Sequence, residues 1–480
     1  MADTLRPGLR LRPNEHRFLL LLGDLAGSIS AAFLALYVWK QYSIYRLVEL
    51  GTRPERAELL VRISVPFWFY LLPLGWLLLM VELYEPHTAS NWRRTLRGIA
   101  VAAFVGLVIY ALVFILNQDP GYLPRIVVGA FLLLASFLTL IWRAAYIRLY
   151  TSSGLQRRVL IVGAGKAGLT LASVYRGMNP PPFSIIGFID DDPRKSKRTF
   201  EGVPVLGSSR HLLEIIDRYR ISDLVMAITG EVQGATFQTI LDAQEQGVEV
   251  TRMPILYEEI AQRVPIHHLE TDWLIRSFVD QLRISMSYEV FKRLFDIIGG
   301  LAGLSVFILT FPFIAIATAI DSGVPIIYAQ TRLGKGGRVF RIYKFRTMCQ
   351  NAEPDGEAKL AAENDPRVTR VGNFLRRTRL DELPQFWNVV HGEMSLVGPR
   401  AERAALVKQF QKEIPFYRAR LLVKPGLTGW AQINYGYVAN VTETAVKLEY
   451  DLYYIKHRSF MMDVMIVLRT IGTVLSRKGR

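Results

Sequence analysis

Four long apolar stretches in the first 150 residues constrain the fold of this chain more than any other feature. They run from Phe18 to Trp39, from Ile63 to Leu83, from Ile99 to Leu116 and from Ile126 to Trp142. Each is close to the roughly 17 to 25 residues that a helix needs to cross a bilayer. Loops rich in charge or proline separate them. We therefore predict a bundle of four transmembrane helices over residues 1–150.

Charged residues near these stretches predict how the bundle is oriented. Asp24 is the only charged residue inside the first stretch, and because a carboxylate in lipid is costly, we expect it to face other helices or to lie near an end. Basic residues flank the N-terminus, the loop from Asn91 to Arg97 and the exit after Trp142. This favours the cytoplasmic side for all three. The first loop is also basic, so charge alone fixes the orientation only in part.

Composition limits the class of protein. A chain of 480 residues with 51% hydrophobic content is too long for one ordinary domain and too apolar to be wholly soluble. The net charge of +16 suits anionic lipid headgroups or polyphosphate substrates. No nucleic-acid partner is expected, because the basic residues cluster beside apolar segments without a reading motif. Cys349 is the single cysteine and no zinc motif occurs, which leaves a carboxylate site for Mg²⁺ open.

Residues 151–275 have the pattern of a Rossmann-like α/β domain. An apolar strand from Arg158 runs into Gly163-Ala164-Gly165-Lys166-Ala167-Gly168, a GxGxxG arrangement that opens a helix. Such glycines let a phosphate approach the helix N-terminus, and Asp190 could meet a ribose hydroxyl. The candidate nucleotide-binding residues are therefore Gly163, Gly165, Gly168 and Asp190. The same glycines could equally serve strand–helix packing in a domain that binds nothing.

The Rossmann-like region raises the alternative of a membrane-bound nucleotide-sugar dehydratase. Such enzymes need a Tyr-x-x-x-Lys pair, and Tyr288 and Lys292 provide one match. The match lies outside the strand-and-helix region, at the start of another apolar run, with no serine or threonine evidently poised beside it. We therefore interpret it as coincidental.

A fifth apolar run, from Ile297 to Ile320, opens the domain that we predict for residues 276–480. Lys292, Arg293 and Asp296 precede it, and Pro312 interrupts it. Hydropathy alone predicts another crossing, which would put the rest of the chain on the opposite side from the Rossmann-like domain. We prefer a re-entrant helix over about 288–320 that breaks near Pro312 and returns to the same side.

Adjacent carboxylates at Asp381 and Glu382 follow a strongly basic tract. Neighbouring carboxylates repel each other unless cations or a metal ion offset their charge. In such a setting a carboxylate can attack phosphorus. Between Gln330 and Met348, basic residues alternate with apolar ones, which suits binding of a pyrophosphate. A solvated ion-pair face is the alternative for any one of these residues.

These segments resemble the polyprenyl-phosphate hexose-1-phosphate transferases, also called monotopic phosphoglycosyl transferases, which start bacterial exopolysaccharide and O-antigen assembly. The resemblance covers essentially the whole chain and is strongest at KFRTM (344–348), LDELPQ (380–385), SLVGPR (395–400) and KPGLTGWAQINYG (424–436). It implies a multi-domain membrane protein with a four-helix transmembrane bundle, a Rossmann-like domain and an α-rich monotopic catalytic domain. In the family the helix break commonly reads Ser-Pro-x-Pro, whereas this chain keeps only Pro312.

By position, the resemblance makes Asp381 the nucleophile that takes a hexose phosphate from a UDP-sugar and releases UMP. Glu382 assists it, and both residues bind Mg²⁺. Undecaprenyl phosphate then attacks the aspartyl intermediate. Six further residues match family positions near the substrate phosphates: Gln330, Arg332, Lys344, Arg346, Arg376 and Arg400. Lys292, Arg293, Asp296 and Pro312 match the re-entrant helix.

The resemblance further implies a multi-pass protein of the bacterial inner membrane, in contact with membrane lipid, with its Rossmann-like and catalytic domains in the cytoplasm. A catalytically silent membrane scaffold or regulator that binds a nucleotide sugar is the alternative from another class. Glucose and galactose are the family-level expectations for the hexose, and a homo-oligomer stays open.

Overall fold

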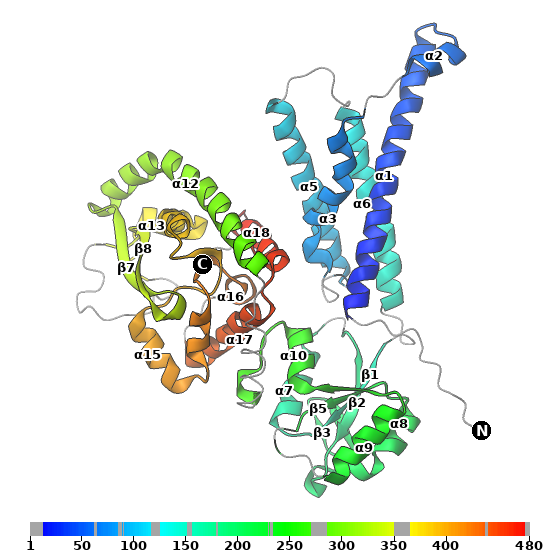
Figure 1. The fold of residues 1–480 in the computed structure, drawn as a ribbon, viewed down its shortest axis with the longest axis vertical. Coiled ribbons are helices and arrows are strands. Elements are labelled where there is room, and N and C mark those ends of the chain that lie inside the picture. The colour runs from blue at the N-terminus through cyan, green and yellow to red at the C-terminus, as the bar shows by residue number, and fades with distance from the viewer. Residues whose placement is uncertain are drawn as a thin grey trace. The chain divides into compact units, whose positions relative to one another are not determined.

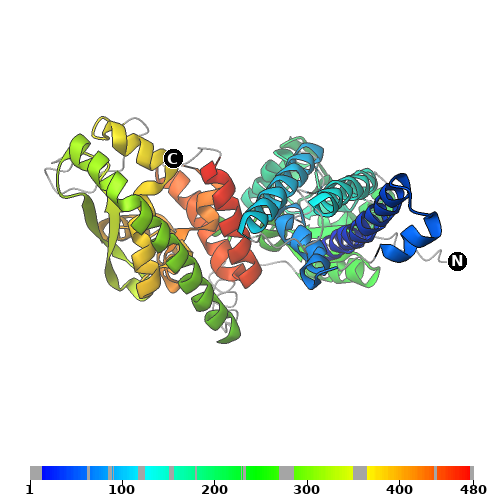
Figure 2. The same cartoon turned by 90° about the horizontal axis from the view of Figure 1, so that it is seen from above.

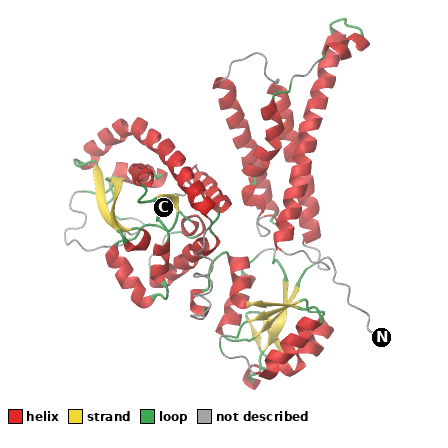
Figure 3. Ribbon diagram, viewed as in Figure 1, coloured by secondary structure: helices red, strands yellow, loops and turns green. Residues whose placement is uncertain are grey.

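The computed structural model describes residues 13–61, 65–84, 89, 91–116, 125–150, 156–178, 181–228, 230, 234–269, 286–349, 365–436 and 440–475. The chain divides into two compact units, with the boundary at Arg252 and residues 229–231 grouped with the second unit. The first unit contains long helices and a six-stranded sheet (Figure 3). The second contains helices and two small two-stranded sheets.

Three long apolar helices run side by side in the first unit (Figures 1 and 2). They are α1 (Pro13–Glu49), α5 (Trp92–Leu116) and α6 (Arg125–Tyr150). Each contains a stretch that is long and apolar enough to cross a membrane. Gly23 on α1 leaves space for the indole of Trp142 on α6, because a Cβ at Gly23 would lie 2.1 Å from that ring. The predicted first, third and fourth membrane helices are confirmed as long apolar helices.

For the predicted second membrane helix, from Ile63 to Leu83, the structure describes residues 65–83 and forms short helical pieces there, and residues 63 and 64 lie outside the described residues. Its described part forms a 3-10 helix, η1 (Phe67–Leu71), and an eight-residue helix, α3 (Leu72–Leu79). Together they are shorter than a helix that spans a bilayer. Pro66 precedes η1 and Pro73 lies in the first turn of α3. Because proline lacks the amide hydrogen that a continuous helix uses, the segment starts anew at these positions.

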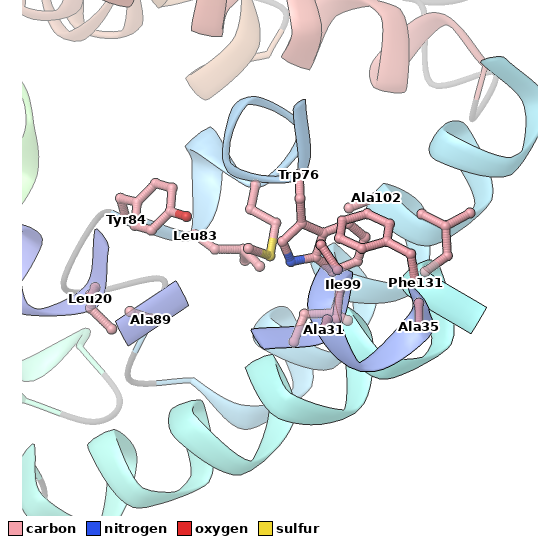
Figure 4. Close-up of a cluster of buried hydrophobic side chains, with 14 of the residues drawn as sticks. Leu20, Ala31, Ala35, Trp76, Leu83, Tyr84, Ala89, Ile99, Ala102 and Phe131 are labelled. Atoms are coloured by element: carbon pink, nitrogen blue, oxygen red, sulfur yellow. The ribbon is translucent and has the colours of Figure 1, made fainter. Parts of the chain in front are cut away.

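The helices before residue 150 share a hydrophobic core (Figure 4). Trp76 of α3, Ile99 of α5 and Phe131 of α6 are buried in it. The indole nitrogen of Trp76 donates to the Thr139 hydroxyl over 3.1 Å, which satisfies the one polar atom of that ring. The broken α3 segment is therefore packed into the bundle by its buried side chains.

A buried ion pair joins α1 to α6. Asp24 and Arg143 have no exposed side-chain surface, and Arg143 Nη2 donates to Asp24 Oδ2 over 2.6 Å. Arg143 Nη1 also donates to the Leu83 carbonyl over 2.6 Å, at η2 (Val81–Tyr84). Asp24 faces other helices as predicted, and the paired cation offsets the cost of its charge.

The sheet of the first unit has the order β3-β4-β2-β1-β5-β6, and β1 pairs in parallel with both β2 and β5. Helices α7 (Lys166–Arg176), α8 (Leu212–Tyr219) and α9 (Gly234–Glu245) lie between the strands in sequence. The predicted parallel α/β sheet is present. The strands are β1 Arg158–Val162, β2 Ser184–Ile189, β3 Thr199–Phe200, β4 Val203–Gly207, β5 Asp223–Met226 and β6 Glu249–Arg252.

The second unit is mostly helical. Its strands pair as an antiparallel hairpin, β7 with β8, and as a short parallel pair, β9 with β10. The elements are α10 Met253–Ala261, α12 Met286–Ser322, β7 Ile327–Leu333, β8 Val339–Phe345, α13 Arg370–Thr378, η8 Leu380–Gln385, α14 Phe386–His391, β9 Ser395–Val397, α15 Ala404–Glu413, η9 Tyr417–Leu422, β10 Gly426–Thr428, α16 Trp430–Asn434, α17 Val441–His457 and α18 Phe460–Leu475.

Helix α12 is bent, and both its ends turn toward the rest of the second unit (Figure 1). Pro312 lies inside it and removes one amide donor. The Thr310 hydroxyl donates to the Val306 carbonyl over 2.8 Å, a bond that also favours bending. The two halves pack on the same unit, since Asp296 accepts from the Leu396 amide over 2.9 Å and Ile314 lies in a core with Phe345 and Leu375.

The outward faces of α12 are strongly apolar. By length and composition this helix is also long and apolar enough to cross a membrane. An exposed apolar surface of this extent suits contact with lipid. Its exposed large residues include Val290, Phe291, Leu294, Ile298, Leu301, Val306, Ile308, Leu309, Phe313, Ile316 and Ile320.

Candidate functional site

The β7–β8 hairpin brings a lysine to the acidic pair. Side chains alternate between the two faces of a strand, and Phe340 and Ile342 on β8 are buried. Lys344 shares their face, and its Nζ donates to Glu382 Oε1 over 2.9 Å. The alternation of basic and apolar residues predicts a strand or a short helix with one cationic face; the structure forms a strand, and Lys344 lies on the face of its buried apolar residues.

Helix α13 is held closely against the segment that follows β8. Its N-cap, Thr369, accepts from the Gly372 amide over 3.1 Å. A Cβ at Gly372 would lie 2.1 Å from the Thr347 carbonyl oxygen, so only glycine permits this approach. One turn later, Arg376 Nε donates to the Thr347 hydroxyl over 2.9 Å. The close packing fixes the direction of Arg376.

The acidic pair follows a sharp turn. Arg379 ends α13 with φ of 55° and ψ of 17°, a left-handed conformation that is uncommon for arginine. The chain then enters the 3-10 turn η8, in which Asp381 and Glu382 are both buried. Two neighbouring carboxylates are thereby removed from solvent, and cations must offset their charge.

Three cations bind Glu382. Oε1 accepts from Lys344 and from Arg400 Nη2 over 3.1 Å, and Oε2 lies 3.5 Å from Arg379 Nη1. Burial opposes ionisation, but Lys344, Arg400 and Arg379 outweigh it and hold the pKa of Glu382 below its ordinary value. Glu382 is therefore ionised, with both oxygens engaged, and is a poor base. Arg379 was not among the predicted site residues, although it belongs to the basic tract RRTRL before the pair.

Asp381 is the available carboxylate of the pair. It is 8% exposed and makes no hydrogen bond or ion pair to any residue that the structure describes. Burial and the adjacent Glu382 charge raise the pKa of Asp381 to about 6, against the opposing effect of nearby cations that include Lys344 and Arg400. Its oxygens have free lone pairs in a cationic setting, as a carboxylate nucleophile requires.

Two buried donors, one just after β8 and one in η8, lack acceptors among the described residues. Arg346 Nη1 and Gln385 Nε2 are inaccessible to solvent and bond to no group in the described parts of the chain. A buried donor without an acceptor costs roughly 1–3 kcal/mol, so each is a candidate to donate a hydrogen bond to a substrate oxygen. Arg346 was predicted from the sequence and Gln385 was missed. The available signal was its position four residues after Asp381, which shares a face in a helical turn.

Two other predicted phosphate-binding residues are engaged by protein groups. Arg332 Nη2 donates to Gln330 Oε1 over 2.6 Å, and Arg332 Nη1 donates to the Ala401 carbonyl over 3.2 Å. The structure thus brings Lys344, Arg376 and Arg400 around the acidic pair. It links Arg332 and Gln330 to the chain just after Arg400 instead.

Glycines in SLVGPR and KPGLTG allow two backbone segments to touch. β9 and β10 pair in parallel, and a Cβ at Gly426 would lie 2.1 Å from the Gly398 nitrogen. A Cβ at Gly429 would lie 2.2 Å from the Gly398 oxygen. These glycines are therefore required for the contact from which Arg400 extends toward Glu382.

The predicted residues at the start of α12 anchor that helix. Lys292 Nζ donates to Asp463 Oδ2 over 3.0 Å, and Arg293 donates to the carbonyls of residues 389 and 390 over 2.9 and 2.7 Å. The Tyr288 hydroxyl donates to the same Asp463 oxygen over 3.0 Å. Tyr288 and Lys292 are thus bound to a shared carboxylate, which supports the interpretation that their Tyr-x-x-x-Lys spacing is coincidental.

The predicted Mg²⁺ site rests on few protein ligands. Among the described residues no group of three or more His, Cys, Asp or Glu side chains could hold a metal ion. Mg²⁺ often binds one or two carboxylates together with waters and substrate phosphates. Asp381 has free oxygens for such a site, whereas those of Glu382 are bound by cations. Asp381 is therefore the one carboxylate of the pair that would hold Mg²⁺, with substrate phosphates as further ligands.

The glycine turn after β1 serves close packing. Gly163 has φ of 109°, which favours glycine, and a Cβ at Gly168 would lie 2.1 Å from the Gly163 oxygen. Gly165, at the N-cap of α7, has open space beside it.

Asp190 is occupied within this turn. Its Oδ2 accepts from the Ala164 amide and from Lys195 Nζ, each over 2.8 Å. Although burial opposes ionisation, these bonds hold the pKa of Asp190 below its ordinary value. An amide that a bound phosphate could use is thus already paired.

Apolar helices of membrane length and a buried carboxylate among cations are features that suit a membrane-associated enzyme. The sequence matches the Bacterial sugar transferase family over residues 287–477 and the CoA-binding domain family over residues 80–254. A UDP-galactose-lipid carrier transferase of Erwinia amylovora is 31% identical over 68% of this chain and 69% of the relative. The chain therefore belongs to the bacterial sugar transferase family.

Other relatives match shorter regions. A UDP-N-acetylgalactosamine-undecaprenyl-phosphate N-acetylgalactosaminephosphotransferase of Aeromonas hydrophila is 44% identical over 48% of this chain and 53% of the relative, about half of its length. A UDP-glucose:undecaprenyl-phosphate glucose-1-phosphate transferase of Escherichia coli is 47% identical over 33% of this chain and 34% of the relative. A solved UDP-D-quinovosamine 4-dehydrogenase from Vibrio fischeri matches 25% of this chain and 98% of that chain at 31% identity, with a TM-score of 0.20 that supports no structural argument.

Proposed function

We propose that the protein transfers a hexose-1-phosphate from a UDP-sugar to undecaprenyl phosphate and releases UMP, as the first membrane step of exopolysaccharide or O-antigen synthesis. The observation that carries this proposal is the free, buried carboxylate of Asp381 beside Lys344, Arg400 and Arg376. The names of the relatives, which include transferases of glucose-1-phosphate and N-acetylgalactosamine phosphate to undecaprenyl phosphate, support it.

The proposed reaction consists of two displacements at one phosphorus atom. First, an Asp381 oxygen attacks the phosphorus that carries the sugar, a P–O bond to Asp381 forms, and the bond to UMP breaks. UMP leaves with the bridging oxygen and its electron pair. Second, an oxygen of undecaprenyl phosphate attacks the same phosphorus and the Asp381 carboxylate leaves. The product is undecaprenyl diphosphate-hexose, and a covalent aspartyl-phosphosugar links the two steps.

The residues around Asp381 have distinct roles in this scheme. Lys344 and Arg400 offset the charge of the diphosphate and, through Glu382, hold the pair in place. The free donors of Arg346 and Gln385 suit oxygens of the donor substrate. Mg²⁺, held by Asp381 and substrate phosphates, would supply further compensation of negative charge when bound. Because Glu382 has a depressed pKa, it acts by organising cations.

For topology we propose that α12 is re-entrant and that both domains outside the bundle lie in the cytoplasm of a bacterium, at its inner membrane. Support comes from the bend of α12 (Figure 1) and from its two halves, which pack on one unit through Asp296 and Ile314. A helix that enters and returns keeps the catalytic unit on the side where UDP-sugars are made.

The activity is tested with the purified full chain, undecaprenyl phosphate and UDP-glucose, UDP-galactose or their N-acetyl forms. Wild type is expected to release UMP with at least one donor, and Asp381→Asn is expected to lose that release. Asp242→Asn on α9, where the carboxylate accepts only a local bond from Gln238, is the matched control and should be active. No release by wild type with any donor would favour the silent scaffold, and unchanged release by Asp381→Asn would reject this nucleophile.

The single cysteine tests the topology. Cys349 is exposed in the second unit. A membrane-impermeant maleimide is expected to label it only after spheroplasts are broken. Labelling of intact spheroplasts would contradict the re-entrant helix, because a crossing helix would put Cys349 outside.

A further inference from the structure

Three consecutive backbone carbonyls, those of residues 400–402, accept hydrogen bonds from other parts of the second unit. The donors are Arg420 Nη2 at 3.2 Å, Arg332 Nη1 at 3.2 Å and the Leu333 amide at 3.0 Å. No regular element of the described chain includes these three residues. The external bonds are therefore what fix the backbone from which the Arg400 side chain extends.

The side chain of Glu402 contacts two of these donors, Arg420 and Arg332, and also Lys447. Its Oε1 lies 3.3 Å from Lys447 Nζ and 3.4 Å from Arg420 Nη1, and its Oε2 lies 3.8 Å from Arg332 Nη1. Burial opposes ionisation, but Lys447, Arg420 and Arg332 prevail and hold the pKa of Glu402 at about 2. At neutral pH this carboxylate is an anion that holds three cations of β7, η9 and α17 together.

Arg420 is fully engaged inside the protein. It is 4% exposed, and it donates to Asp451 Oδ2 and to the Tyr417 hydroxyl, each over 2.8 Å. Its remaining nitrogen contacts are to Glu402 and to the Arg400 carbonyl. A guanidinium with these partners has a fixed direction, and its two terminal nitrogens are bound by protein groups.

Because this network ends at Arg400, it also reaches the acidic pair. Arg400 Nη2 binds Glu382 Oε1 over 3.1 Å, and Glu382 adjoins Asp381, the free carboxylate. Displacement of the Arg400 backbone would withdraw one cation from Glu382 and shift the charge balance at the reacting oxygen. Misplacement of about 1 Å in a catalytic group can cost on the order of 100-fold in rate.

We propose that Glu402 and Arg420 are positioning residues for the transfer reaction: they fix residues 400–402 so that Arg400 binds Glu382 and leaves Asp381 free to react. The inference rests on the proposed function, because it assigns residues that support the same site. It also assigns Arg332 to this network, as a partner of Glu402 and Ala401, in place of direct contact with the substrate phosphates.

A double-mutant cycle with the full chain tests the proposal. Glu402→Gln is expected to lower kcat for UMP release about 10-fold with little change in KM for the UDP-sugar, and Arg400→Gln to lower it about 100-fold. The double variant is expected to match Arg400→Gln within about 3-fold, since a residue that acts through Arg400 has nothing left to position. A double variant about 1,000-fold below wild type, or a Glu402→Gln enzyme with wild-type kcat, would overturn the proposal.

Glu258→Gln is the matched control. Glu258 is a buried glutamate of the same unit, bound by Lys456 over 2.9 Å and His457 over 3.0 Å, and it contacts none of the site residues described above. Its substitution removes the same charge from another ion cluster. Any effect on kcat should multiply with that of Arg400→Gln, and non-additivity with this control as well would overturn the proposal.

Two further measurements keep the test decisive. If Glu402→Gln does not fold, as judged by its thermal unfolding, Arg420→Lys takes its place. Lysine keeps the charge, but its single nitrogen cannot replace both Nη1, which contacts Glu402, and Nη2, which donates to the Arg400 carbonyl. A wild-type protein that releases no UMP with any UDP-sugar would overturn the proposed function and this inference together. An active wild type with multiplicative double variants would overturn this inference alone.

Discussion

Replacing Gln385 with methionine separates what the fold requires from what the reaction requires. Gln385 is 3% exposed, and its Nε2 has no acceptor among the described residues. A buried donor left unpaired costs roughly 1–3 kcal/mol. Methionine has a similar length and no such donor, so the free energy of unfolding of Gln385→Met should stay level or rise by about 1 kcal/mol. Catalysis should lose a hydrogen bond to a charged oxygen, about 1.5–3 kcal/mol, or roughly 10- to 100-fold in kcat/KM.

Asn388→Leu is the matched control, three residues further along. Asn388 has no exposed surface, and its Nδ2 donates to the Arg341 carbonyl and to Glu393 Oε2, each over 2.7 Å. Leucine removes one buried acceptor without a donor, Asn388 Oδ1, but it takes the donor away from two acceptors, so we expect the free energy of unfolding to fall by about 1–3 kcal/mol. The two buried amides should therefore change stability in opposite directions.

The assay pairs denaturant unfolding in detergent with steady-state UMP release by each folded variant. A Gln385→Met protein that is destabilised as much as Asn388→Leu would refute the reasoning, because the amide would then serve the fold. A stable Gln385→Met protein with wild-type kcat/KM would refute it as well, because the free donor would then have no substrate oxygen to bind.

Three further predictions concern pH dependence, packing and charge. Burial raises the pKa of Glu449, a neighbour of Arg263 and Tyr257, from the ordinary 4.5 to about 7. The stability that neutral Glu449 contributes is present below pH 4.5 and is lost as the pH rises through about 7. Glutamine cannot ionise, so between pH 4.5 and pH 8 the free energy of unfolding of Glu449→Gln, measured with denaturant, should fall by up to about 3 kcal/mol less than that of wild type. An equal pH dependence of the two proteins would contradict this. Gly372→Ala should displace α13 and lower kcat about 100-fold, because its Cβ would lie 2.1 Å from the Thr347 oxygen. A Gly372→Ala enzyme with the kcat of wild type would show that the close packing of α13 on Thr347 does not matter for the reaction. Glu382→Gln leaves Lys344, Arg400 and Arg379 without their shared anion, so its free energy of unfolding at pH 7 should fall by about 3 kcal/mol, and an unchanged denaturation midpoint would contradict that ion cluster.

The sequence predicts elements that depend on local patterns. Apolar length gives α1, α5 and α6, whereas the alternation of basic and apolar residues leaves a strand or a short helix open, and the structure forms the strand β8. Pro66 and Pro73 predict a kink in the second apolar stretch, and the structure has them at the starts of η1 and α3, a division that hydropathy alone does not reveal.

Contacts between distant residues could not be predicted in the same way. Asp24 was expected to find an interior position, but its partner Arg143 lies 119 residues away. Arg332 has the residue type of a phosphate ligand, yet its partners Ala401 and Glu402 follow only from the packing of β7 on the chain after Arg400. Gln385 likewise becomes a candidate only when the atoms around its amide are known.

The covalent step at Asp381 is tested most directly by incubating the full chain with its UDP-sugar in the absence of undecaprenyl phosphate. The two-step mechanism predicts a burst of one UMP per enzyme and a peptide that carries hexose phosphate on Asp381, detected by mass spectrometry, and the adduct should disappear when undecaprenyl phosphate is added. UMP release that requires undecaprenyl phosphate from the first turnover, with an unmodified Asp381, would contradict it.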